Sequence, residues 1–206
     1  MPDKLRTQPT QDRARLRIDE ILSAARRLLV REGYEKFNTN LLAQESGCNI
    51  GTVYRYFPEK NGVIVAVYRE WLAEAAAKND EVLSAPGEWS HPADLAALHF
   101  EAFVDGLSDD DHKLAVELTK ALFMNRHVRD ADDLHKAGLI KAYRDVLTET
   151  GFSDVDPRLL DFWAELCFSL MLMVSMAPPA ERSFVKRQAG QVIRSTINPG
   201  AGDKTG

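Results

Sequence analysis

The sequence predicts an all-α protein with about nine helices, and three observations carry this prediction. Apolar residues recur at spacings of three and four through most of the chain. No segment alternates apolar and polar residues around an Asn-Gly or Asp-Gly turn, as a β-hairpin would. Glycine and proline interrupt the helical pattern at the points where one helix would end and the next would begin.

The first sixty residues predict three helices after a short arm. Residues 1–10 are polar, contain two prolines and are expected to form a disordered arm. An amphipathic period predicts a helix over 11–32, and Gly33 stands where a left-handed C-cap would end it. Two short helices are expected over 39–46 and 49–57, capped by Thr39 and Asn49.

The rest of the chain predicts six more helices. The segment 84–92 contains Pro, Gly and Ser, as loops do. Asp156 and Pro157 are suited to the N-cap and first turn of a helix, and Pro178 with Pro179 ends that helix. The expected helices cover residues 60–80, 92–107, 111–126, 131–150, 157–177 and 180–197.

The composition is that of a globular chain and excludes several classes of protein. Of the 206 residues, 45% are hydrophobic and 28% are charged, which argues against a disordered or collagen-like chain. The longest apolar run, Leu166 to Ala177, is too short to span a bilayer, and the first twenty residues lack the apolar stretch of a secretory signal. Two cysteines cannot build a disulfide framework. We therefore expect a cytoplasmic protein with no membrane segment.

The stretch from Thr39 to Phe57 has the pattern of a helix-turn-helix. Two short helices that cross steeply need a small residue at the crossing and a flexible residue in the turn. Ala43 and Gly47, four residues apart, meet these two requirements. The residues expected to face the core between the two helices are Leu42, Cys48, Val53 and Tyr56.

The charge distribution and the second short helix favour binding to nucleic acid. Residues 1–60 hold eleven Lys and Arg against eight Asp and Glu, a net charge of +3, whereas residues 61–206 hold fifteen against twenty-three, a net charge of −8. The second helix offers small and polar residues to base edges, and a basic run with Arg13 and Arg17 precedes it. The alternative is that the tyrosines of the motif only pack and that the basic run is a solvated face.

Residues 21–68 resemble the DNA-binding domain of the TetR family of transcriptional repressors. The matching features are the run from Ala24 to Tyr34, then Phe37 and Thr39, and the string GTVYRYFPEK from Gly51. In that family the domain has three helices, and the second and third form the helix-turn-helix.

The resemblance implies roles for eight residues of the motif. Residues that match Asn49, Ile50, Thr52 and Arg55 lie on the recognition helix and are expected near bases. Residues that match Thr39, Tyr54, Tyr56 and Lys60 contact phosphates. Cys48 stands where the family usually has an apolar residue, and a cysteine fits there as a small hydrophobic side chain.

A dimer is expected because one helix-turn-helix reads only a few base pairs, and a two-fold pair reads two half-sites. The helices expected over 157–177 and 180–197 are the candidates, since the first is apolar nearly all round. The alternative is that these residues form only the core of one chain, although the family pairs its last two main helices between subunits. The expected interface residues are Leu159, Trp163, Leu166, Leu170, Met173, Phe184, Val192 and Ile193.

The resemblance also implies a pocket for a small apolar or aromatic effector among the later helices. In the family, a ligand that prefers one conformation shifts the population away from the DNA-competent one. The alternative is that the bulky residues are plain core. The residues expected to line the pocket are Trp71, Phe100, Phe103, Phe123, Tyr143 and Trp163.

The sequence predicts neither an enzyme nor a cofactor or metal site. The five histidines are dispersed and make no zinc-binding spacing. None of the motifs GxSxG, P-loop or GxGxxG occurs.

The sequence thus favours a homodimeric transcriptional regulator, a repressor that binds a palindromic operator in double-stranded DNA and is released by a small molecule. The alternatives are a DNA-binding regulator without such a ligand and an all-α enzyme or interaction module. The expected organisation is an arm over 1–10, a helix-turn-helix DNA-binding domain over 11–60, a regulatory and dimerisation domain over 61–198 and a loose tail over 199–206.

Overall fold

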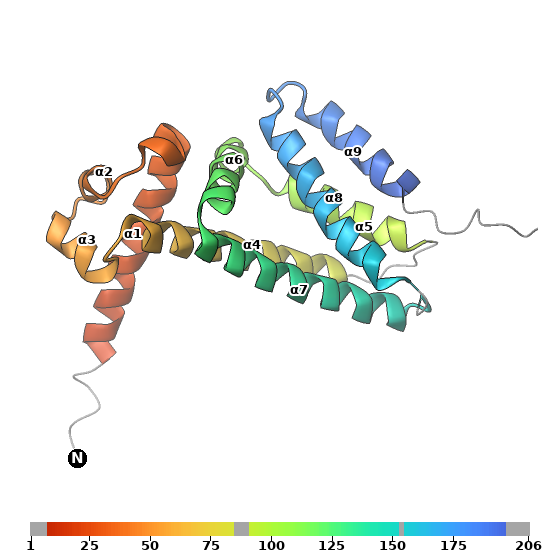
Figure 1. Ribbon diagram of the computed structural model, residues 1–206, viewed down its shortest axis with the longest axis horizontal. Coiled ribbons are helices and arrows are strands. Elements are labelled where there is room, and N and C mark those ends of the chain that lie inside the picture. Colours follow the sequence, from red (N-terminus) through yellow and green to blue (C-terminus); the bar gives the residue numbers. More distant parts are fainter. Residues whose placement is uncertain (1–7, 85–90, 153–154, 197–206) are drawn as a thin grey trace, which may run out of the picture. The chain divides into compact units, whose positions relative to one another are not determined.

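The computed structural model describes residues 8–84, 91–152 and 155–196, and within these ranges it contains nine helices and no strand (Figure 1). The all-α prediction is therefore confirmed. Most of the expected arm and the whole expected tail lie outside the described residues. Helix α1 (Gln8–Lys36) begins inside the expected arm, so residues 8–10 are helical.

By its contacts the chain divides into two compact units. Unit 1 comprises residues 1–71 and 117–131, and unit 2 comprises residues 72–116 and 132–206. Three helices contribute residues to both units: α4 (Lys60–Ser84), α6 (Asp109–Met124) and α7 (Arg126–Glu149). The functional boundary expected after residue 60 stays a prediction.

Unit 1 is built from α1, α2 (Thr39–Glu45), α3 (Ile50–Tyr56) and the adjoining parts of the three shared helices. Its core consists of apolar residues at helical spacing, as the period of α1 predicts. Gly33 interrupts α1 with φ of 81° and ψ of 166°, which confirms the expected break in the helix. The largest fully buried side chains of this unit are Ile21, Leu28, Leu29, Phe37, Leu42, Ile64 and Leu118.

In unit 2, α5 (Pro92–Asp105) packs against both α8 (Pro157–Met176) and α9 (Arg182–Thr196), which also pack against each other (Figure 1). Helix α5 is buried on most of its surface, so it forms the centre of the unit. Helix α8 has the length and composition of a membrane-spanning helix. Its inner side is buried against these neighbours, so a core position in the unit explains the apolar residues of that side.

Two helix starts differ from expectation because of capping side chains. Asn125 accepts a hydrogen bond at Oδ1 from the His127 N–H at 3.0 Å, so α7 begins five residues before the expected position. Ser108 and Asp111 form a reciprocal pair at the start of α6. The Ser108 N–H donates to the Asp111 carboxylate at 3.0 Å, and the Asp111 N–H donates to Ser108 Oγ at 3.2 Å.

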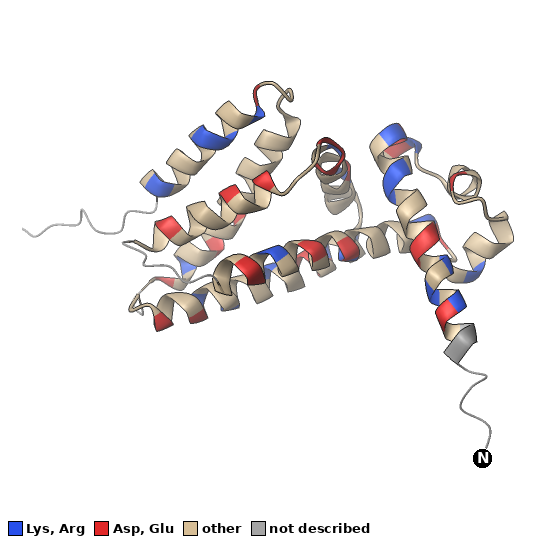
Figure 2. Ribbon diagram, turned by 180° about the vertical axis from the view of Figure 1, so that it is seen from behind, with Lys and Arg blue, Asp and Glu red and all other residues tan. Residues whose placement is uncertain are grey.

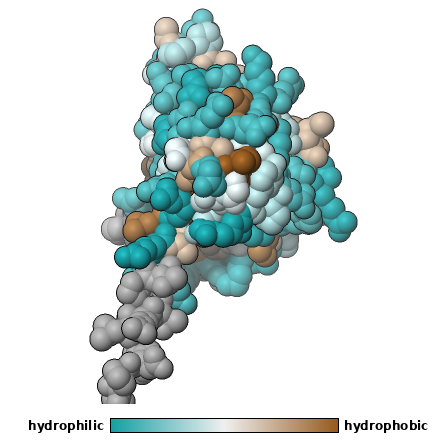
Figure 3. Space-filling model, turned by 90° about the vertical axis from the view of Figure 1, so that its left-hand side faces the viewer, coloured by the Kyte–Doolittle hydropathy of each residue, from teal (hydrophilic) through white to brown (hydrophobic). Residues whose placement is uncertain are grey.

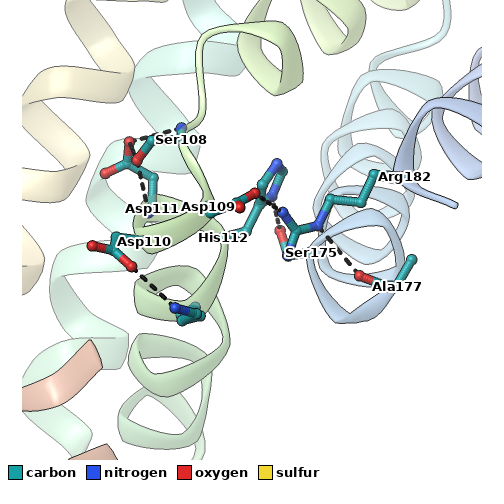
Figure 4. Close-up of polar contacts among 9 residues, drawn as sticks. Ser108, Asp109, Asp110, Asp111, His112, Ser175, Ala177 and Arg182 are labelled. Carbon is teal, nitrogen blue, oxygen red and sulfur yellow. Dashed lines mark hydrogen bonds and ion pairs between the residues drawn. The ribbon is translucent and has the colours of Figure 1, made fainter. Parts of the chain in front are cut away.

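The first turn of α6 is fixed to the corner between α8 and α9 by polar contacts (Figure 4). The Arg182 guanidinium donates to the Asp109 carboxylate and to the Ala177 carbonyl. Behind this ion pair, His112 Nδ1 lies 3.0 Å from Ser175 Oγ, and both side chains are buried. Burial lowers the pKa of His112 below its usual range, and the Arg182 charge lowers it further.

A second buried histidine lies at the centre of unit 2. His99 on α5 forms a hydrogen bond through Nε2 with Asn79 Oδ1 of α4, and its ring meets the Tyr143 ring edge to face at 5.3 Å. Burial lowers the pKa of His99 to about 4, and the nearby His135 lowers it too. His99 is therefore neutral at pH 7 in the folded protein.

We expect His99 to make the protein less stable in mild acid. Its pKa is lower in the folded state than in the unfolded state, so the unfolded chain binds more protons as the pH falls below about 6.5, and stability is lost towards pH 4. Between pH 7.5 and pH 5 the loss from this group is about 2 kcal/mol. Urea denaturation at both pH values measures it.

The control is the His99→Gln variant, which keeps a hydrogen-bond donor but does not titrate. Its stability should fall by about 2 kcal/mol less than that of the parent over the same pH interval. The buried His112 and the half-buried His135, whose pKa values are also lowered by desolvation, leave some acid sensitivity in the variant. An identical loss in both proteins would contradict the assignment.

Candidate functional site

The two short helices of unit 1 form the predicted helix-turn-helix. Gly47 lies between them with φ of +65°, the left-handed conformation that a tight turn needs. Leu42, Ala43 and Val53 are buried on the facing sides of the two helices, and Cys48 is half-buried. The small, flexible and apolar residues therefore have the conformation and burial that the pattern predicts.

Asparagine side chains cap both helices. Asn49 caps α3 as expected, because its Oδ1 accepts from the Thr52 N–H at 2.7 Å and from the Thr52 hydroxyl at 3.0 Å. Thr39 does not cap α2. The cap is Asn38, whose Oδ1 accepts from the Leu41 N–H at 3.0 Å, and Thr39 is the first helical residue. Both residues have capping side chains, so the sequence did not distinguish them.

Thr39 and Tyr54, two of the residues expected at phosphates, lie together although they are fifteen residues apart. The Thr39 hydroxyl is 3.1 Å from the Tyr54 hydroxyl, and Tyr54 is exposed. Two hydroxyl groups at this distance on the start of α2 and the outer side of α3 can contact a single phosphate group.

Arg55 and Tyr56 form a second pair on α3. An Arg55 guanidinium N–H donates to the Tyr56 hydroxyl at 2.8 Å, and the guanidinium lies over the Tyr56 ring at 4.7 Å. Tyr56 is half-buried, so it serves both the packing and the polar surface. Ile50 and Thr52 are half-buried, and Asn49 is exposed at the start of the same helix.

Lys60, the remaining residue expected at a phosphate, has partners inside unit 1. Its Nζ donates to the Tyr34 carbonyl at 3.1 Å and lies over the Tyr34 ring at 4.8 Å and the Phe37 ring at 5.8 Å. Burial lowers the pKa of Lys60 below its usual range. Lys60 thus contributes to the fold of the unit whatever it binds.

The surroundings of α3 suit an anion. Helix α3 contains Arg55 and no acidic residue. The acidic residue at the end of α2, Glu45, is paired with Arg27 at 3.0 Å and with Arg31 at 2.8 Å, and these pairs lower the pKa of its carboxyl. Figure 2 shows Lys and Arg spread along α1. The face of unit 1 with α2 and α3 is mostly hydrophilic, with a few small apolar patches (Figure 3).

The residues expected at a dimer interface divide into two groups. Trp163, Leu170 and Ile193 are buried in the core of unit 2 and face away from the surface. For these three the expectation is corrected, because the inner side of α8 and α9 is as apolar as the outer side. Met173, Phe184 and Val192 are exposed, and Leu159 and Leu166 are half-buried. Helix α8 has further apolar residues at the surface that were not expected there: Phe162 and Met176 are exposed, and Phe168 and Leu172 are half-buried.

The residues expected to line a pocket also fall in different places. Phe100, Tyr143 and Trp163 are buried in unit 2, and Phe103 is half-buried beneath the Lys78 ammonium, which is 5.5 Å from its ring. Trp71 is buried in unit 1. Phe123 is 70% exposed near the end of α6, so it is not part of a buried pocket.

Comparison with known proteins agrees with this architecture. Residues 21–67 match the family model of the bacterial regulatory proteins of the tetR family. No curated protein sequence matches the chain. The chain has the fold of a TetR-family transcriptional regulator.

Three solved structures illustrate the similarity of this TetR-type fold. A TetR-family transcriptional regulator from Rhodococcus sp. has a TM-score of 0.65 at 19% identity, and the match covers 86% of this chain and 98% of that one. A transcriptional regulator from Rhodococcus sp. Rha1 has a TM-score of 0.71 at 16% identity, with 89% and 96% covered. FadR from Bacillus subtilis, in complex with stearoyl-CoA, has a TM-score of 0.66 at 17% identity, with 87% and 97% covered.

The cap of α3 gives a direct test of the site's construction. Asn49→Ala removes the acceptor for the Thr52 N–H and hydroxyl, so it should lower the free energy of unfolding by about 1 kcal/mol. Asn49→Asp keeps the acceptor and should retain most of the stability. Urea denaturation of the full chain measures both, and an alanine variant as stable as the parent would show that the cap is not needed.

Proposed function

We propose that the chain is a homodimeric transcriptional repressor that binds a palindromic operator and is released from it by a small molecule bound in unit 2. The observation that carries the proposal is the helix-turn-helix of residues 39–56, within the segment that matches the TetR family. Its outer side is polar, and the acidic residue within it, Glu45, is paired with Arg27 and Arg31. Such a protein acts in the cytoplasm. The domain limits expected from the sequence assign DNA binding to residues 11–60 and regulation and dimerisation to residues 61–198.

In this proposal, residues on and around α3 have two roles in binding DNA. Asn49, Ile50, Thr52 and Arg55 lie near bases, while Thr39, Tyr54, Tyr56 and Lys60 contact phosphates. The exposed Arg55 can form two hydrogen bonds with a guanine edge once it leaves the Tyr56 hydroxyl. The Asn49 oxygen is occupied by the cap, so its amide nitrogen is the group free to reach DNA.

The exposed apolar residues of α8 and α9 support the dimer. Met173 is 55% exposed, and Phe162, Met176 and Phe184 are exposed as well. Helices α8 and α9 pack side by side, so these residues lie on neighbouring helices. An apolar surface of this kind is costly to leave in water, and a second copy of the chain can cover it with the same residues.

Release by a ligand follows from a difference in affinity between two conformations. A molecule that binds better to the conformation with poor DNA contacts shifts the population towards it. FadR from Bacillus subtilis, which shares the fold, binds stearoyl-CoA, and this supports a ligand site among the corresponding helices. A regulator without such a ligand is the outcome to expect if no compound releases the operator.

Selection of bound duplexes from a random pool, at two salt concentrations, tests the DNA-binding part. A palindromic consensus supports the proposal and gives the spacing of the half-sites. Binding without sequence preference that vanishes at moderate salt would overturn it.

Lys60→Ala should weaken binding to every duplex and make the salt dependence shallower by roughly one unit, because one phosphate contact is lost. The variant also loses the bond to the Tyr34 carbonyl, so its fold is checked by thermal melting. Lys141→Ala, which removes an exposed lysine of unit 2, is the control for net charge. An unchanged salt slope in Lys60→Ala would leave Lys60 with only its structural role.

Met173→Glu should break the dimer. The substitution places two carboxylates in the shared interface of a two-fold pair, so the dissociation constant should rise by about 100-fold or more. Leu134→Glu makes a similar change at an exposed leucine of α7 and should have no such effect. Analytical ultracentrifugation measures both, and a Met173→Glu variant that dimerises like the parent would contradict the interface.

A further inference from the structure

One buried hydrogen-bond donor of unit 2 has no acceptor. Trp163 is 3% exposed, and among the described residues its indole Nε1 has no hydrogen-bond partner. Buried indole N–H groups nearly always find an acceptor, since leaving one unpaired forfeits its bond with water. The unpaired Trp163 N–H therefore either destabilises the fold or donates a hydrogen bond to a bound ligand.

Trp163 is one of five polar side chains in the core of unit 2, the polar core cluster. Asn79, His99, Tyr143 and Trp163 are buried, and Cys167 is half-buried. These residues come from four helices of unit 2: α4, α5, α7 and α8. Asn79 and His99 are hydrogen-bonded, and the His99 and Tyr143 rings touch. Cys167 is near enough to Tyr143 to contribute to the raised pKa of its hydroxyl. Cys167 also follows Trp163 by one turn on α8, so both side chains lie on the same side of that helix.

The polar core cluster is uncharged at pH 7. Burial lowers the pKa of His99 to about 4, raises the pKa of Cys167 to about 12 and raises the pKa of Tyr143 well above its usual range. His135, whose charge influences His99, is also neutral because burial lowers its pKa.

Several charged side chains on the helices around the cluster are paired at the surface. Glu165, two residues after Trp163, is exposed and accepts from Lys136. Two of the three carboxylates of α5, Glu101 and Asp105, pair with Arg194 and Lys186 of α9. A ligand carboxylate or ammonium brought to the cluster would therefore lose its hydration without gaining a counter-ion, which is unfavourable.

We propose that the Trp163 N–H anchors the effector of this protein, and that the effector is an uncharged, mainly apolar molecule with a hydrogen-bond acceptor such as a carbonyl oxygen. The proposal rests on the ligand-binding part of the proposed function and names its ligand class. The donor-only indole selects an acceptor. The core of unit 2, which includes the buried Phe100, Leu170 and Met171, is apolar and selects the rest of the molecule.

Four probes of matched shape test the ligand class on the full chain: para-butylacetophenone, para-butylbenzoate, para-butylbenzylamine and butylbenzene. Calorimetry should show that the neutral ketone binds most tightly. The benzoate and the benzylamine should bind at least about tenfold more weakly, because each must bury an unpaired charge. Tighter binding of either charged probe, or no binding of any probe, would overturn the proposal.

Trp163→Phe tests the anchor, because it removes the N–H and keeps most of the ring surface. It should weaken binding of the ketone about tenfold, the effect of one lost hydrogen bond, and change binding of butylbenzene by less than about twofold. Equal ketone affinity in the parent and in Trp163→Phe would overturn the anchor.

Duplex selection without any probe, run on the same preparations, separates this proposal from the proposed function. Operator binding together with failure of the probe ranking rejects the ligand class and leaves the DNA-binding function intact. The expected ranking without operator binding supports the ligand class and rejects the DNA-binding function.

Discussion

The construction of unit 1 depends on the hydrogen bonds of one residue, Tyr34. Its N–H donates to the Glu117 carboxylate of α6 at 2.8 Å, and its carbonyl accepts from Lys60 of α4 at 3.1 Å. Gly33 permits this arrangement, since its φ is +81° and a Cβ there would lie 3.1 Å from the Glu117 oxygen. After Tyr34, the chain continues through the buried Phe37 to Asn38, the cap of α2. The contacts that orient the helix-turn-helix are therefore made just before it begins.

The hydrogen bonds of Tyr34 affect how the outer side of unit 1 can bind DNA in the proposed complex. Lys60 cannot reach a phosphate without loosening its bond to Tyr34, and Arg55 and Tyr54 also have partners in the unit. These contacts hold the side chains in place and reduce the entropy lost on binding. In the proposed complex with DNA, each would be exchanged for a bond to a phosphate or a base. Bonds to an ionised acceptor are the stronger ones, so the exchange favours DNA.

The sequence predicted the helix-turn-helix well because its requirements are local. A small residue at 43, a glycine at 47 and an apolar residue at 53 each constrain neighbours a few positions away. The contact between Tyr34 and Glu117 joins residues 83 positions apart and depends on packing, which no local pattern encodes. The caps at Asn38 and Asn125 were missed for a different reason. Each lies beside another plausible helix boundary, and only backbone geometry decides between them.

Helix α8 shows where the period of a sequence stops being informative. Leu160, Trp163, Leu170 and Val174 are buried, whereas Phe162, Met173 and Met176 on another side are exposed. A helix that is apolar on both sides has no period that tells inside from outside, so the sequence assigned Trp163 and Leu170 to the dimer surface. Successive residues are about 100° apart around a helix, which separates Phe162 from Trp163. The proposed effector anchor and the proposed dimer surface therefore occupy different sides of α8, and a substitution on one side leaves the other intact.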